Sequence, residues 1–286
     1  MNNIQQMTIS KPVGCFGVGV HSGDIISMKL SPAAEDTGII FKRIDLAGTK
    51  SEIQANYSSV SNTRLSTTIS NQDGTEVATI EHLMAALWGC GIDNVIVEVT
   101  GKEVPIMDGS SEPFVFMLEC AGVTLQKKKR KMIEILKPVF VSEGMASVSV
   151  HPAEHFSVTM DIDFQNTIIS KQSCSFDSRE VSFKNSLSRA RTFGFAHEID
   201  HLRKMGLARG GSLDNAIVVS GDKILNQDGL RYADEFARHK VLDAIGDFSL
   251  ACASVMGRFH GVCSGHSLNN KLLHQIFADQ EAWRFV

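Results

Sequence analysis

The sequence lacks any pair of cysteines at C-x-x-C spacing, although six cysteines are scattered over its 286 residues. Scattered cysteines are typical of reduced thiols and argue against a disulfide framework or a cysteine-type zinc site. No apolar run approaches the ~20 residues of a membrane-spanning helix, and residues 1–10 lack the charged and apolar regions of a signal peptide. We therefore expect a cytoplasmic protein with no transmembrane segment.

An excess of either charge is also missing. Lys and Arg number 28 against 32 Asp and Glu, so the net charge is only −4, which predicts no basic face for nucleic acid. The one dense basic run, 127–131, is interpreted as a solvated linker between two domains, 1–126 and 132–286. The hydrophobic fraction of 43% and the chain length suffice for two cores.

Apolar periodicity predicts the same kinds of element in both halves. Alternating apolar residues predict strands, among them 146–151 and 156–164. Helices are expected at 77–89, where apolar residues recur at i, i+3, i+4 and i+7, and also around 178–190 and 231–254. Because strands, helix, strand and helix follow in the same order in each half, we predict two domains of similar α+β architecture.

The helix expected at 231–254 carries a polar stripe at four-residue spacing, made of Glu235, His239, Asp243 and Asp247. Stacked carboxylates repel one another, and burying them in an otherwise apolar helix is costly. A bound cation would remove this cost, and His239 and Asp243 could supply two ligands from one helix face. The alternative is a solvated polar face, because H-x-x-x-D is a short pattern.

Two further segments place a histidine where chemistry is possible. In the helix at 77–89, Glu81 and His82 lie beside each other, about 100° apart around the axis, and alanines near His82 leave room for a ligand. His266 follows a glycine-containing turn and opens the last apolar helix. Taken alone, either histidine is also compatible with a surface or packing role.

Residues 197–201 read H-E-I-D-H, a literal H-E-x-x-H zinc-protease signature. Gly206 soon ends the helix, and no third ligand follows at metzincin spacing. A five-residue pattern with two free positions arises readily by chance. We therefore interpret His197 and His201 as surface or packing residues, and a zinc protease using them with Glu198 is a rival hypothesis.

Longer stretches resemble one known family when they are taken together. They are T-I-E-H-L-M-A-A-L from 79, P-I-M-D-G-S from 105, S-R-A-R-T-F-G-F from 188, H-K-V-L-D-A-I-G-D from 239, S-G-H-S-L-N-N-K-L-L from 264 and Q-E-A-W from 280. In this order they are similar to the UDP-3-O-acyl-N-acetylglucosamine deacetylases of lipid A biosynthesis. The resemblance runs from residue 14 to the C-terminus.

The resemblance implies a fold and an activity. The implied fold is α+β, with two similar two-layer α/β-sandwich domains, the helices packed between the sheets, and a β-α-β unit inserted in the second domain at 194–219. The implied reaction is hydrolysis of UDP-3-O-acyl-N-acetylglucosamine to acetate and UDP-3-O-acyl-glucosamine, the committed step of lipid A biosynthesis in Gram-negative bacteria. Zn²⁺ would be held by His82, His239 and Asp243, with a fourth position open to water. Iron can compete at such a site.

The same resemblance implies roles for residues around the metal. Glu81 would be the general base toward the attacking water, and the Thr192 hydroxyl would help to stabilise the oxyanion. His266, as an imidazolium held by Asp247, would protonate the leaving amine. Glu235 receives no role and is expected outside the site.

The implied partners are the acylated UDP-sugar and water, and we expect a monomer. Lys240 would hydrogen-bond the glucosamine or its ester, Phe193 would pack near the sugar, and Phe164 would stack in the uridine region. The inserted unit would form an apolar passage for the acyl chain, with Ile199, Ala208, Ser212 and Val218 in it.

Some positions depart from the family pattern. Many members carry Lys directly before the S-G-H turn, toward the diphosphate, where this chain has Cys263, so Arg258 or His260 would have to replace that cation. Glu198 stands where Asp is common, and Arg64 where Met is common. These differences bear on substrate affinity and acyl preference. A third hypothesis is a non-catalytic sugar-nucleotide or lipid-binding protein that keeps the fold.

Overall fold

The chain forms two halves, each a sheet with helices on one face. In the first half the elements are β1 (Gln5–Ile9), β2 (Val13–Val18), β3 (Ile25–Pro32), β4 (Ile39–Arg43), β5 (Glu52–Gln54), β6 (Val60–Asn62), β7 (Thr68–Ser70), β8 (Glu76–Val77), α1 (Glu81–Gly89), β9 (Val95–Val99), α2 (Glu112–Ala121) and β10 (Val123–Lys129). In the second half they are β11 (Met132–Ile135), β12 (Val139–Glu143), β13 (Ala146–His151), β14 (Phe156–Phe164), β15 (Ser170–Asp177), α3 (Phe183–Ser186), β16 (Phe193–Phe195), α4 (Ala196–Lys204), β17 (Ile217–Ser220), β18 (Lys223–Ile224), α5 (Glu235–Phe248), β19 (Ser254–Val262), α6 (His266–Ala278) and β20 (Trp283–Phe285). Short 3₁₀ helices occur at Thr49–Ser51, Tyr57–Ser59 and Ser249–Ala251.

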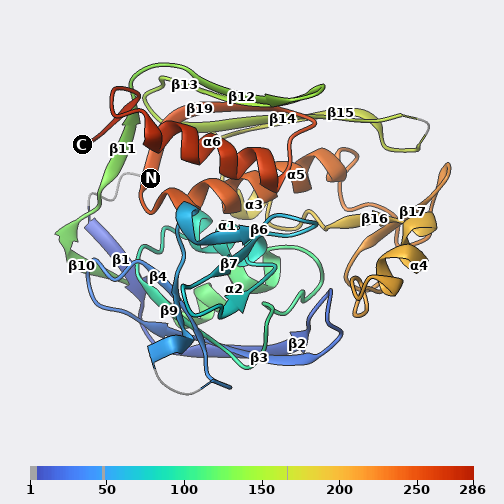
Figure 1. Cartoon of the computed structure of the whole chain (residues 1–286), viewed down its shortest axis with the longest axis horizontal. Helices are drawn as coiled ribbons and strands as arrows, with labels where there is room; N and C mark the ends of the chain where they lie inside the picture. Colours follow the sequence, from blue (N-terminus) through green and yellow to red (C-terminus); the bar gives the residue numbers. More distant parts are fainter. Residues whose placement is uncertain (1–4, 47–48, 166) are drawn as a thin grey trace.

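Two sheets enclose the main helices, as Figure 1 shows. The computed structural model describes residues 5–46, 49–165 and 167–286. The first sheet has the strand order β2-β3-β9-β4-β5, and the second has the order β12-β13-β19-β11-β20, with β14 paired to β19 and β15. Helices α1, α2, α5 and α6 lie between these two layers (Figure 1). The predicted α+β class with helices between the sheets is confirmed.

Each sheet buries one face because its strands alternate in sequence. In β3, Ile26, Met28 and Leu30 are buried while Ser27 and Lys29 point to solvent. Strand β14 repeats this pattern over nine residues. One apolar face per sheet needs a cover, and the helix layer supplies it for both sheets.

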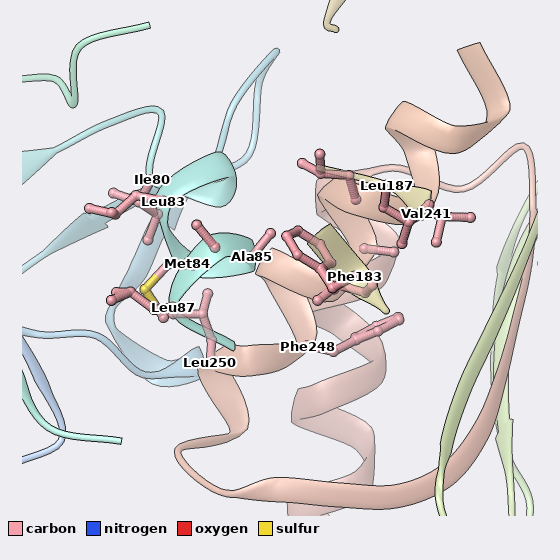
Figure 2. Close-up of a cluster of buried hydrophobic side chains, with 14 of the residues drawn as sticks. Ile80, Leu83, Met84, Ala85, Leu87, Phe183, Leu187, Val241, Phe248 and Leu250 are labelled. Carbon is pink, nitrogen blue, oxygen red and sulfur yellow. The ribbon is translucent and has the colours of Figure 1, made fainter. Parts of the chain in front are cut away.

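The two halves meet where α1 packs against α5. Figure 2 shows Leu83, Met84 and Leu87 of α1 on one side, with Phe183 and Phe248 of the second half on the other. All five side chains are buried, and each buried apolar side chain contributes about 1.5–3 kcal/mol to the free energy of unfolding. The contact between the two halves is therefore a shared core.

A glycine sets how closely these two helices approach. Gly246 of α5 faces α1, and a Cβ at this position would lie 2.2 Å from the Glu81 carbonyl oxygen. Only a residue without a side chain fits this contact. The close approach brings the first turn of α1 directly beside the C-terminal part of α5.

Helix α5 is shorter than the 231–254 that the sequence predicts. It spans Glu235–Phe248, because a 3₁₀ turn follows and Cys252 then adopts a left-handed φ of 61°. Strand β19 begins at Ser254. The helix expected around 178–190 is reduced to the single turn of α3.

The basic run expected as a linker at 127–131 is partly a strand. Lys127–Lys129 end β10, which pairs antiparallel with β1. The backbone N–H groups of the first two of these lysines donate to the Glu35 carboxylate. The lysine side chains of the run are exposed, whereas the Arg130 side chain is only 6% exposed and lies 2.8 Å from the Asp93 carboxylate. Strand pairing and the Glu35 carboxylate fix the backbone of the run.

A β-α-β unit projects from the second half, as expected. Strands β16 and β17 are parallel, α4 connects them, and β18 completes a small sheet that extends to one side of the molecule in Figure 1. The unit contacts the β2–β3 turn, where Arg209 and Gly210 donate backbone N–H groups to the carbonyls of His21 and Val20. Among the described residues no helix combines the length and apolarity of a membrane span.

Candidate metal centre

Three potential metal ligands converge at the contact between α1 and α5. His82 lies in the first turn of α1, and His239 and Asp243 lie one turn apart on α5. Their donor atoms all lie within 4.8 Å of one another, and all three residues are buried. In the described part of the chain, no other group of three His, Cys, Asp or Glu side chains comes this close together.

The arrangement of the donor atoms suits coordination of a shared metal ion better than hydrogen bonding between the three side chains. Asp243 Oδ1 lies 3.5 Å from His82 Nε2 and 3.3 Å from His239 Nε2. Within the described residues this buried oxygen accepts no hydrogen bond. An unsatisfied buried carboxylate oxygen is costly, and two imidazoles with one carboxylate are a common ligand set for catalytic zinc.

The protonation states also suit metal binding. Burial lowers the pKa of His239 to about 3, so the ring is neutral. His239 Nδ1 lies 3.0 Å from the Ala190 carbonyl oxygen, which favours the tautomer with hydrogen on Nδ1 and a free lone pair on Nε2. Burial would raise the pKa of Asp243, but the charge that His239 would carry at low pH and the Lys240 ammonium, 2.7 Å from Oδ2, hold it well below its usual range.

A second group of ionisable side chains lies next to the ligands. Glu81 Oε1 is 3.9 Å from His266 Nε2, and His266 Nδ1 is 2.9 Å from Asp247 Oδ2. Burial would lower the pKa of His266, but Asp247 and Glu81 raise it to about 9. Burial raises the pKa of Glu81 despite the neighbouring histidines. The pair thus combines a carboxylate of raised basicity with an imidazolium.

Thr67 connects these groups, and nothing in the sequence pattern singled it out. Its N–H donates to Glu81 Oε2 at 3.0 Å, and its hydroxyl donates to Asp247 Oδ1 at 2.6 Å. Asn269 Nδ2 donates to Asp247 Oδ2 at 2.8 Å. One loop residue of the first half therefore orients both the carboxylate beside the ligands and the carboxylate that holds His266.

The P-I-M-D-G-S stretch forms a turn that supports the site from the first half. The Ser111 hydroxyl, directly after it, donates to the His82 carbonyl at 2.7 Å. The Gly109 carbonyl accepts the N–H of Thr192 at 2.8 Å. Gly109 has a φ of 82°, and a Cβ there would lie 2.1 Å from the Asn215 carbonyl oxygen, so only glycine fits.

Phe193 and Lys240, which are both expected to contact substrate, lie directly beside the ligands. The Phe193 ring centre is 6.4 Å from that of His239 and 5.8 Å from Lys240 Nζ. The Phe164 ring centre lies 5.6 Å from that of Phe193. Thr192 precedes Phe193 on the segment whose Ala190 carbonyl contacts His239. An aromatic surface therefore runs from the ligands outward.

Phe164 also lines a hollow of about 810 Å³ at the edge of the second sheet. Cys263 lines the same hollow and has a left-handed φ of 49°. His260, one of the two residues considered as a replacement for the family lysine, lies with Nε2 2.6 Å from Asp161 Oδ2. This ring nitrogen is therefore already occupied by a carboxylate, whereas Arg258 is exposed on β19.

The inserted unit holds the remaining predicted residues. Val218 is buried, Ile199 and Ala208 are half-buried, and Ser212 is exposed. Ala208 has a left-handed φ of 52°, which its small side chain tolerates better than a bulky one would. Whether these side chains line a passage for an acyl chain stays a prediction.

A buried metal-ligand triad beside a carboxylate and an imidazolium is typical of mononuclear metal-dependent hydrolases. The chain belongs to the UDP-3-O-acyl N-acetylglycosamine deacetylase family (LpxC), whose model matches residues 6–278. The resemblance inferred from the sequence is thus confirmed.

Individual relatives match over almost their whole length. The UDP-3-O-acyl-N-acetylglucosamine deacetylase of Phenylobacterium zucineum is 49% identical over 98% of this chain and 95% of the relative. Proteins of the same name from Saccharophagus degradans and Marinobacter nauticus are 48% and 50% identical, each over 99% of this chain and 93% of the relative.

Proposed function

We propose that this chain is a zinc-dependent hydrolase that removes the N-acetyl group from UDP-3-O-acyl-N-acetylglucosamine. Water and the amide give acetate and UDP-3-O-acyl-glucosamine, the committed step of lipid A biosynthesis. The observation that carries the proposal is the unpartnered Asp243 Oδ1, within 3.5 Å of the Nε2 atoms of His82 and His239. Family membership and the names of the relatives support the choice of substrate.

The chain's own side chains divide the proton transfers between them. Bound Zn²⁺ supplies a Lewis acid that polarises the amide carbonyl and lowers the pKa of a water ligand toward about 7. Glu81 takes a proton from the attacking water, which its raised pKa favours. His266 enters the reaction as an imidazolium, and it gives its proton to the leaving amine while Asp247 orients the ring.

Polar and aromatic side chains beside the metal ligands orient the sugar. The Thr192 hydroxyl donates to the oxyanion that develops on the amide oxygen. Lys240 keeps two donors beyond its bond to Asp243 and directs them to the glucosamine or its ester. Phe193 packs against the sugar, and Phe164 offers its ring at the hollow for uridine.

The inserted unit takes the 3-O-acyl chain in this proposal. Its candidate contacts are Ile199, Ala208, Ser212 and Val218, in a unit whose β16–β17 pair begins at Phe193. The protein works in the cytoplasm as a monomer.

The test is acetate release by His82→Ala and Asp243→Ala, with zinc content measured on the same samples. We expect both variants to lose tight zinc binding and more than about 1000-fold in kcat/KM, because the Lewis acid is lost. His155→Ala is the matched control, since it removes a histidine that lies 2.7 Å from Asp177 away from the site. Full zinc content and activity in both ligand variants would contradict the proposal. Tight UDP-sugar binding without acetate release, in zinc-loaded wild type, would favour the non-catalytic binder.

A further inference from the structure

Glu235, which the sequence left without a role, is one of the most deeply buried ionised groups in the described chain. It lies in the first turn of α5, and its side chain is 0% exposed. Arg191 Nε lies 2.9 Å from Glu235 Oε1, and Arg191 Nη2 lies 3.2 Å from Oε2. This two-pronged ion pair joins α5 to the segment that leads into β16.

The donors around Glu235 satisfy its carboxylate completely. Besides the guanidinium, the backbone N–H of Arg191 donates to Oε1 at 3.1 Å and that of Arg231 donates to Oε2 at 2.5 Å. Arg191 Nη2 also donates to the Gly229 carbonyl at 2.8 Å. A buried charge with this many partners holds the surrounding backbone in one arrangement.

The peptide unit between Ala190 and Arg191 leads from this pair to the metal ligands. Its N–H donates to Glu235, and its C=O accepts from His239 Nδ1 at 3.0 Å. The peptide group is planar, so its N–H and C=O cannot turn independently. Glu235 and His239 lie one helical turn apart on α5. The Glu235 side chain contacts the N–H of this planar peptide group, and the His239 side chain contacts its C=O.

We propose that Glu235 is a positioning residue for the metal site, orienting the Ala190–Arg191 peptide so that its carbonyl holds the Nδ1–H tautomer of His239. In that tautomer Nε2 faces Asp243 and is free to bind a metal ion. The inference rests on the proposed function only for the identity of the metal. It assigns the S-R-A-R stretch a physical task, the delivery of one carbonyl to one ligand.

Two measurements distinguish a positioning role of Glu235 from a purely stabilising one. The first is the tautomer of His239 in the metal-free protein, measured from ¹⁵N chemical shifts of the imidazole. The second is the dissociation constant of Zn²⁺, measured by competition with a chelator. For Glu235→Ala we expect a mixed tautomer population and about 10-fold weaker zinc binding, at the lower end of the 10–100-fold typical of groups that support ligands. Glu235→Gln keeps an acceptor for the peptide N–H, so we expect a smaller change in both readouts.

Arg43→Met is the control for loss of an ion pair that has a buried guanidinium. Arg43 Nη2 lies 2.6 Å from Asp45 Oδ2 just after β4, and the side chains are 7% and 34% exposed. We expect this variant to lower the melting temperature with no change in His239 tautomer or zinc affinity. If Glu235→Ala and Glu235→Gln keep the wild-type tautomer and zinc affinity, Glu235 is a stability residue and the proposal is wrong. The tautomer readout needs no zinc, so a failure of the wild type to bind zinc would overturn the proposed function and leave this test intact.

Discussion

Helices α1 and α4 carry the same two residue types, yet only one of them contributes to a candidate metal centre. Helix α4 contains the literal zinc-protease pattern, and its three defining residues His197, Glu198 and His201 are all exposed to solvent. Helix α1 contains only the dipeptide Glu81–His82, and both residues are buried. The longer motif therefore belongs to the helix that lies away from the ligand cluster.

The difference lies in what packs against each helix. Glycine at position 246 lets α5 approach the first turn of α1, so His82 meets two ligands from the other half of the chain. The described α4 buries none of its residues, and its main contacts are with β16 and β17 of the inserted unit. Metal sites need donors that converge in a dry environment, and convergence depends on tertiary packing that no five-residue pattern contains.

The largest expected effect comes from a substitution in α1 itself, next to the ligand His82. Glu81→Gln removes the proposed base and keeps the size of the side chain, so we expect kcat to fall about 100- to 10,000-fold. Zinc affinity should stay near the wild-type value, because His82 and the α5 ligands remain. Steady-state kinetics and zinc content, measured together, check this. Loss of zinc in Glu81→Gln would mean that Glu81 supports the ligands and is not a separate base.

The pH dependence of kcat/KM assigns the two proton-transfer roles. His266 carries its proton below its pKa of about 9, so activity that needs the imidazolium should fall as the pH rises through about 9. Glu81 must be ionised, so activity should fall as the pH drops through its raised pKa. We expect a bell-shaped profile that loses its alkaline limb in His266→Ala and its acid limb in Glu81→Gln. Because the two groups interact, the limbs report the pair, and an unchanged alkaline limb in His266→Ala would contradict this assignment.

A smaller effect is expected from the residue that connects the two carboxylates. Thr67→Val removes the hydroxyl bond to Asp247 and keeps the N–H bond to Glu81. We expect kcat to fall about 10-fold, as for other groups that orient catalytic side chains, with KM and zinc affinity unchanged. Thr159→Val removes a comparable hydroxyl contact to Ser175 on an exposed strand face and should leave kcat unchanged. Equal kcat values in the two variants would rule out the coupling role of Thr67.

Much of the fold was predictable from periodicity. Strands β13 and β14 have the predicted bounds, because their residues alternate between a buried and a half-buried face. The helix at 77–89 and the one at 231–254 both exist but are shorter, since Thr79 and Cys252 take left-handed φ values of 58° and 61°. Backbone reversals at non-glycine residues leave no trace in an apolar pattern, so helix ends were the weakest predictions.

The site was predictable where side-chain chemistry identifies it. His239 and Asp243 share one helix face, and that spacing alone suggested two ligands. Thr67 and the Ala190 carbonyl were not predictable, because a hydroxyl in a polar loop and a backbone oxygen carry no sequence signature. Glu235 was placed outside the site from the sequence, yet it bonds to the peptide that holds a ligand. The sequence did contain one indication of its place near the site, because Glu235 lies four residues before His239 on the same helix face.

The smallest expected effect tests the comparison between the two helices most directly. His197→Ala and His201→Ala alter the most recognisable metal motif in the chain, and we expect acetate release and zinc content to change less than about twofold. Exposed side chains that touch no ligand contribute little to stability or binding. Because Phe195 contacts the His197 ring at 5.7 Å between centres, a modest rise in KM for acylated substrate is compatible with packing in the inserted unit. A loss of zinc or of kcat in either variant, comparable to that in His82→Ala, would transfer the metal centre to α4 and reverse the comparison.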